Sequence, residues 1–97
     1  MALLSQDEID SGLQQLDGWT RDGDSIARSV EASSFIDGIR LVSAVAEVAE
    51  DLNHHPDIDI RYTTITFTLS THSEGGLTQN DLRLAGDINR LAPGPAE

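Results

Sequence analysis

The sequence predicts one α+β domain in two layers, a four-stranded antiparallel sheet with helices packed on one face. Apolar residues recur at helical period in three segments, and they alternate with polar residues in two pairs of short segments. The 97 residues suffice for one core, and no linker or internal repeat divides them. We therefore expect a single domain over residues 1–97, with a frayed tail at 93–97.

A helix and a hairpin are expected first. Ser5 and Glu8 have the spacing of a capping box, and apolar residues then follow at helical period until Gly18. Asp22-Gly23-Asp24 separates two extended segments, and its glycine can adopt positive φ in a tight turn. A short amphipathic helix over residues 5–16 and a β-hairpin are the result.

The longest helix is expected to run from Ser33 or Ser34 to about Leu52, because one apolar face continues at helical period across this segment. Pro56 disfavours a helical conformation for His55. The helix therefore has to end near two adjacent histidines, at a junction between a helix and a strand.

A second hairpin and a last helix complete the fold. Residues 57–61 and 64–70 alternate apolar with polar side chains, so one face should be buried against the long helix. Residues 74–76 break regular structure, and Thr78 with Asp81 repeats the capping spacing at the start of the last helix. The uncovered sheet face and open edges predict self-association as a homodimer or homotetramer.

Composition excludes several classes of function. Seventeen acidic residues against six basic ones give a net charge of −11, which repels phosphate backbones and anionic membranes, so we expect no direct nucleic-acid or membrane binding. No cysteine is present, which excludes disulfides and thiolate chemistry and fits a cytoplasmic protein. The sequence shows neither a signal sequence nor a long apolar run, so it predicts neither export nor a membrane span.

The three histidines, His54, His55 and His72, fall close together in the sequence, with Glu50 and Asp81 nearby. Imidazoles beside carboxylates suit general acid/base catalysis, because only this side chain has an unperturbed pKa near neutrality. Metal binding by Glu50, His54 and His72 is the alternative, since two nitrogens and a carboxylate form catalytic zinc sites. The spacing differs from His-Glu-x-x-His, so we expect no metal.

Simpler interpretations remain open for several of these residues. His54-His55 can be exposed helix-end histidines, favourable at the negative end of the helix dipole. Asp81 can be only a helix cap, and Trp19 can belong to the core or border a pocket for a flat ligand. If the helix persists to His54, Glu50 points the same way as that histidine.

Taken together, Glu50-x3-His54-His55-Pro56-x5-Tyr62-x9-His72-x8-Asp81 resembles the signature of the pterin-4a-carbinolamine dehydratase family, also known as the dimerisation cofactor of a homeodomain transcription factor. The resemblance spans roughly Leu16 to Ile88. It includes Gly18-Trp19, Leu69-Ser70-Thr71-His72 and Gly76-Leu77-Thr78.

The resemblance implies loss of water from a 4a-hydroxytetrahydropterin to give the quinonoid dihydropterin, with no metal or organic cofactor. It implies that His54, His55 and His72 are the acid/base and orienting groups, and that Glu50 and Asp81 hold the imidazoles in the required tautomer and charge. It further implies supporting contacts to the pterin from the backbone of Ser70 and Thr71 and from the ring of Trp19.

Asn53 departs from the family pattern, in which many relatives have an acid directly before the histidine pair. An amide can accept a hydrogen bond but adds no charge, so we expect a lower pH optimum.

A binding module is the second hypothesis. Animal relatives also stabilise the dimer of a transcription factor, so the chain could instead be a non-catalytic protein that acts through its oligomer interface. A small accessory subunit of a cofactor-recycling or molybdopterin-linked enzyme is a third reading.

Overall fold

The computed structural model describes residues 2–93, so all but the first residue of the tail expected at 93–97 lies outside the described residues. The predicted α+β class is confirmed. The elements are α1 (Gln6–Gln14), β1 (Thr20–Asp22), β2 (Ser25–Glu31), α2 (Phe35–Leu52), β3 (Asp57–Arg61), β4 (Thr64–Leu69), the short 3₁₀ helix η1 (His72–Glu74) and α3 (Gln79–Leu91).

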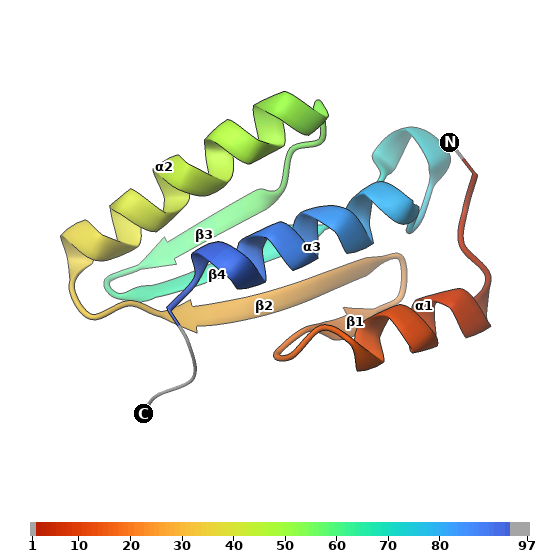
Figure 1. The fold of residues 1–97 in the computed structure, drawn as a ribbon, viewed down its shortest axis with the longest axis horizontal. Helices are drawn as coiled ribbons and strands as arrows, with labels where there is room; N and C mark the ends of the chain where they lie inside the picture. The colour runs from red at the N-terminus through yellow and green to blue at the C-terminus, as the bar shows by residue number, and fades with distance from the viewer. Residues whose placement is uncertain (1, 94–97) are drawn as a thin grey trace.

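The four strands form one antiparallel sheet in the order β1-β2-β4-β3. The two strands of each hairpin, β1 with β2 and β3 with β4, pair with each other. The hairpins are joined by the pairing of β2 with β4, in which Ile26 lies opposite Leu69. Figure 1 shows the resulting sheet behind the helices, with β1 and β3 at its two edges. Each edge strand therefore has one side that no strand within residues 2–93 covers.

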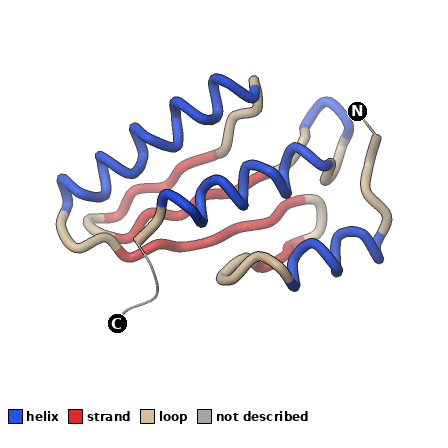
Figure 2. Tube along the Cα trace, viewed as in Figure 1, coloured by secondary structure: helices blue, strands red, loops and turns tan. Residues whose placement is uncertain are grey.

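The core lies between the sheet and the helices. Figure 2 shows α2 and α3 running across one face of the sheet, with α1 at the side. The fully buried side chains of the core come from β2, β4, α2 and α3: Ile26, Ile65, Phe67, Leu69, Val45, Leu84 and Ile88. Their alternation in the strands and helical period in the helices are the patterns that predicted these elements.

Local signals set the predicted ends of the helices. Ser5 and Glu8 form the capping box of α1, with the Glu8 N–H 3.1 Å from the Ser5 hydroxyl. Of the two candidate serines, Ser34 caps α2 and accepts from the Asp37 N–H. In the first hairpin Gly23 adopts a φ of 59°, as the turn requires.

Two details differ from the prediction. Ile60 was expected in the buried face of the sheet, yet it is 39% exposed because β3 is an edge strand. Residues 72–74 form η1, where only irregular structure was expected. None of the helices within residues 2–93 is both long and apolar enough to cross a bilayer.

The fold gathers three chain segments at one end of the molecule. In Figure 1 the C-terminal end of α2, η1 and the N-terminal end of α3 lie together, with the turn between β1 and β2 at the same end of the sheet. His54 and His55 directly follow α2, and His72 begins η1, so all the histidines lie at this end.

Candidate active site

The end of α2 determines where the adjacent histidines point. Asn53 adopts the left-handed conformation (φ 50°, ψ 45°), and the backbone N–H of His54 donates to the carbonyl of Ala49 at 3.0 Å. This pattern is a Schellman motif, in which asparagine is the usual substitute for glycine. The reversal of the backbone at Asn53 sends His54 and His55 in different directions.

His55, not His54, is the partner of Glu50. Nε2 of His55 lies 2.5 Å from Oε2 of Glu50, and the two side chains are 55% and 74% exposed. Glu50 and His54 would point the same way only if the helix persisted to His54, and this condition is not met because α2 ends at Leu52. Glu50 and His55 form a surface pair in contact with solvent.

His54 turns inward to Asp81 at the start of α3. Its Nε2 lies 2.6 Å from Oδ1 of Asp81, and the histidine side chain is only 10% exposed while the carboxylate is fully buried. This contact joins the end of one helix to the beginning of another. The interpretation of His54 as an exposed helix-end histidine is therefore wrong.

Asp81 is held by further donors. Its Oδ2 accepts from the backbone N–H of Thr78 at 2.9 Å, which is the predicted helix cap, and from the hydroxyl of Thr71 at 2.7 Å. The hydroxyls of Thr71 and Thr78 are 2.8 Å apart. Capping and contact with a histidine, two alternative readings of Asp81, thus occur in the same side chain.

His72 directly follows Thr71 and begins η1, with its side chain exposed. It borders an open hollow of about 380 Å³ on the face of the sheet that the helices leave uncovered. The hollow is lined by Asp22, Asp24, Ser25, Asp57, Thr68, Ser70, His72 and Gly75. Hydrogen-bond donors of a small ligand would find carboxylates and hydroxyls here.

The structure thus gathers the histidines at one end of the fold without joining all three rings. Thr71 bonds to Asp81, the partner of His54, and is followed directly by His72. Neither His54 nor His55 lines the hollow beside His72. Thr71 therefore connects the buried pair, through its bond to Asp81, with His72 at the border of the hollow.

Other predicted site residues have structural tasks. Trp19 is buried in the core, and its Nε1 donates to Oδ1 of Asn89 at 2.8 Å, far along α3 from Asp81. The backbone N–H of Thr71 donates to the carbonyl of Gly76 at 2.8 Å, so it is not free to pair with a ligand. The hydroxyl of Ser70 donates to the carbonyl of Asp24 at 2.7 Å.

Two residues of the site were missed by sequence reasoning. Thr78 was predicted only as the first residue of a cap, and Asp57 only as part of the wet face of a strand. Their signals were present, because Thr78 is fixed relative to Asp81 by the capping spacing and Asp57 directly follows the His-His-Pro sequence.

Metal ligands do not converge in the described part of the chain. No three histidine, aspartate or glutamate side chains among residues 2–93 are arranged to hold an ion. Glu50 and His54, which the metal alternative placed together, instead bond to different partners.

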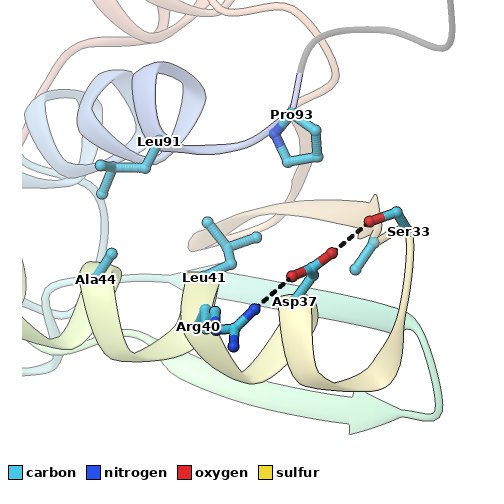
Figure 3. Close-up of a pocket in the computed structure, with 8 residues that line it drawn as sticks. Ser33, Asp37, Arg40, Leu41, Ala44, Leu91 and Pro93 are labelled. Atoms are coloured by element: carbon cyan, nitrogen blue, oxygen red, sulfur yellow. Dashed lines mark hydrogen bonds and ion pairs between the residues drawn. The ribbon is translucent and has the colours of Figure 1, made fainter.

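A second hollow lies at the opposite end of the molecule (Figure 3), also about 380 Å³ in volume, between the start of α2 and the end of α3. Its lining is mostly apolar and includes Leu41 and Leu91, with Asp37 bonded to Ser33 and paired with Arg40. The hydroxyls of Ser33 and then Ser34 lower the pKa of Asp37 below its ordinary value. No histidine lines it.

Comparisons with known proteins agree with the sequence signature. A family model described as pterin 4 alpha carbinolamine dehydratase matches residues 2–91. A Mycobacteroides abscessus protein, provisionally named a pterin-4-alpha-carbinolamine dehydratase, is 57% identical over 89 residues, covering 92% of this chain and 95% of that protein. A Nocardia farcinica protein with the same provisional name is 59% identical over 90 residues, covering 93% of this chain and 95% of its own length.

Solved structures share the fold. A Brucella melitensis protein, described as a transcriptional coactivator/pterin dehydratase, has a TM-score of 0.91 and 33% identity, covering 95% of this chain and all (100%) of that chain. A pterin dehydratase-like protein, described as a RuBisCO assembly factor in the alpha-carboxysome, has a TM-score of 0.65 and 18% identity, covering 79% of this chain and 89% of that chain. The latter similarity concerns the fold alone. By its family-model match and its close relatives, this chain belongs to the pterin 4 alpha carbinolamine dehydratase family.

Proposed function

We propose that the protein is a dehydratase that removes water from a 4a-hydroxytetrahydropterin and gives the quinonoid dihydropterin. The observation that carries this proposal is the buried pair of His54 and Asp81, which a hydrogen bond connects to Thr71, the residue directly before His72 at the border of a hollow. An imidazole held by a carboxylate, in a chain of this family, is a group that can give or take a proton.

The reaction requires one proton to be given and one to be taken. The C–O bond at C4a breaks as its oxygen receives a proton and leaves as water, while the neighbouring ring nitrogen loses a proton and forms a double bond to C4a. Hydroxide is a poor leaving group, so a positioned acid lowers the barrier. The products are one water molecule and the dihydropterin, and no electron is transferred.

Three imidazoles are available for these transfers. Nε2 of His54 faces Asp81 and Nε2 of His55 faces Glu50, so Nδ1 is the ring atom that each can offer to a ligand. His72 borders the hollow directly. We propose that His54, His55 and His72 share the acid, base and orienting functions, with Asp81 and Glu50 fixing the two rings.

Substrate contact is proposed on the polar side of the hollow. The amide-like edge of a pterin carries N–H donors, from which the Asp57 carboxylate and the backbone carbonyl of Ser70 could accept hydrogen bonds. Trp19, buried and bonded to Asn89, is left out of this contact.

Turnover of a 4a-hydroxytetrahydropterin, followed by ultraviolet absorbance, tests the proposal. The wild-type protein should accelerate dehydration, and the His54→Ala, His72→Ala double variant should lose at least about a hundredfold of that acceleration. Asp59→Asn, on an exposed strand position, is the control that should retain activity. Full activity in the double variant would reject the assignment of these histidines.

A binding function is the second candidate, favoured by the coactivator description of the Brucella melitensis protein. A well-folded wild type without turnover would support it. A homodimer or homotetramer and a cytoplasmic location stay predictions.

A further inference from the structure

Thr78, Thr71 and Asp81 form one buried chain of hydrogen bonds that ends at His54. The Thr78 hydroxyl lies 2.8 Å from that of Thr71, the Thr71 hydroxyl donates to Oδ2 of Asp81 at 2.7 Å, and Oδ1 of Asp81 lies 2.6 Å from Nε2 of His54. Both threonines and the aspartate are buried. The backbone of Leu3 forms an isolated antiparallel bridge with that of Thr78.

The hydrogen atoms of this chain can be arranged in only one direction. Each hydroxyl has a single hydrogen, and a carboxylate only accepts. Because Thr71 gives its hydrogen to Asp81, its oxygen must accept from Thr78. The hydrogen between Asp81 and His54 then belongs to Nε2 of the ring.

Capping of α3 alone does not explain the arrangement. In the capping box of α3, the Asp81 carboxylate needs to accept only from the Thr78 N–H, at Oδ2. The second donor on that oxygen, the Thr71 hydroxyl, comes from outside the helix. It leaves Oδ1 as the oxygen that faces His54.

We propose that Thr71 and Thr78 are positioning residues of the dehydratase, which hold Asp81 in one rotamer and so hold His54 in the tautomer with hydrogen on Nε2 and Nδ1 directed to the substrate. This inference rests on the proposed function. It also links His54 to His72, because Thr71 immediately precedes His72.

The Thr71→Val variant removes the hydroxyl and keeps the shape. We expect turnover to fall by about ten- to a hundredfold, the size of one hydrogen bond to a charged group, and the pH–rate profile to move. Nitrogen NMR of the His54 ring should change from one tautomer to a mixture. Thr71→Ser, which keeps the hydroxyl, should restore turnover, the pH–rate profile and the ring signals.

Two further variants keep the test decisive. The Thr71→Val, Thr78→Val double variant leaves no hydroxyl of the pair without a partner, so it is the one to use if Thr71→Val does not fold. Thr66→Val breaks a hydroxyl pair of the same 2.8 Å length with Ser29, on the exposed face, and should leave turnover and the His54 ring unchanged.

The inference fails if a folded Thr71→Val protein shows the wild-type His54 signals and pH–rate profile, or if Thr71→Ser is equally impaired. Absence of turnover in the wild type would instead reject the proposed function. The ring signals of His54 need no turnover, so they would still decide whether Thr71 and Thr78 set its tautomer.

Discussion

Oδ1 of Asp81 lies 2.6 Å from Nε2 of His54, although 27 positions separate the two residues in the sequence. The other oxygen of the same carboxylate caps α3 through the Thr78 N–H. One side chain therefore stabilises a helix and orients a histidine. Loss of this carboxylate should affect both the free energy of unfolding and the chemistry, through different oxygen atoms.

Asp81→Asn separates these two effects. The amide oxygen can still accept from Thr78, but the NH₂ group would face His54 and favour the opposite tautomer. We expect turnover to fall by about a hundredfold and the free energy of unfolding by about 1–3 kcal/mol. Steady-state kinetics and urea denaturation measure the two. Wild-type turnover in the folded variant would show that Asp81 is only a cap.

Glu50→Gln tests the exposed pair. Both side chains are largely in solvent, so the free energy of unfolding should change by less than about 0.5 kcal/mol. Turnover should fall at least severalfold, because His55 loses the group that orients its ring. Asp51→Asn, the neighbouring exposed acid on α2, is the control for the change in surface charge. Equal kinetics in the two variants would remove Glu50 from the proposed site.

Most of the fold could be predicted because its signals are local. The alternation of β4 and the period of α2 each report burial within one element, and the Ser5 and Ser34 caps are read from spacing of three residues. The 3₁₀ helix η1 was missed because its hydrogen bonds close around Thr71, whose carbonyl accepts from Glu74 and Gly75. No periodic pattern reports a single turn.

The pairing of the candidate site residues could not be predicted from the sequence. The histidines and the two acids of the signature lie at one end of the fold, whereas Tyr62 is exposed in the turn between β3 and β4. Glu50 pairs with His55 because the left-handed conformation of Asn53 reverses the chain. Likewise, the contact of Trp19 with Asn89 spans 70 positions and has no local signal. Spacing within a helix predicts which side chains share a face, but it does not predict the direction of the chain beyond the helix end.

The acid side of the stability profile should depend on Asp37. Its pKa is lowered by the Ser33 hydroxyl first and then by the Ser34 hydroxyl, so the folded protein binds this proton less readily than the unfolded chain. The stabilisation is complete above the ordinary pKa of 3.8 and is lost as the pH falls through the lower, folded value.

Urea denaturation of the wild type and Asp37→Asn at pH 7 and pH 3 measures this effect. The difference in free energy of unfolding between the two proteins should shrink at pH 3. In Ser33→Ala, carboxyl carbon NMR should show the titration of Asp37 moving back toward 3.8. An unchanged titration in Ser33→Ala would contradict the assigned cause.

Self-association should depend on the open edge of the sheet. Among the described strands, β3 pairs with β4 alone, and Ile60 on this strand is 39% exposed. We expect the wild type to sediment as a dimer or tetramer and Ile60→Lys to dissociate more readily, because an exposed lysine discourages edge pairing. Leu91→Lys replaces a leucine of similar exposure beside the second hollow. Dissociation by Leu91→Lys alone would move the interface to the helices.

Asn53 offers the last test, because its backbone and its side chain can be separated. The left-handed conformation that ends α2 suits asparagine, aspartate and glycine, so Asn53→Asp and Asn53→Gly should both keep the directions of His54 and His55. Only Asn53→Asp adds a negative charge beside the two histidines. A nearby carboxylate favours protonated imidazole, so the acid form should persist to higher pH.

The pH optimum of turnover should therefore rise in Asn53→Asp and stay at the wild-type value in Asn53→Gly. The pH–rate profiles of the three proteins, recorded at one ionic strength, measure the shift. The same shift in both variants would point to the backbone, and no shift in Asn53→Asp would show that charge at this position does not reach the reacting imidazoles. A rise confined to Asn53→Asp would support the expectation that the missing charge at this position lowers the pH optimum.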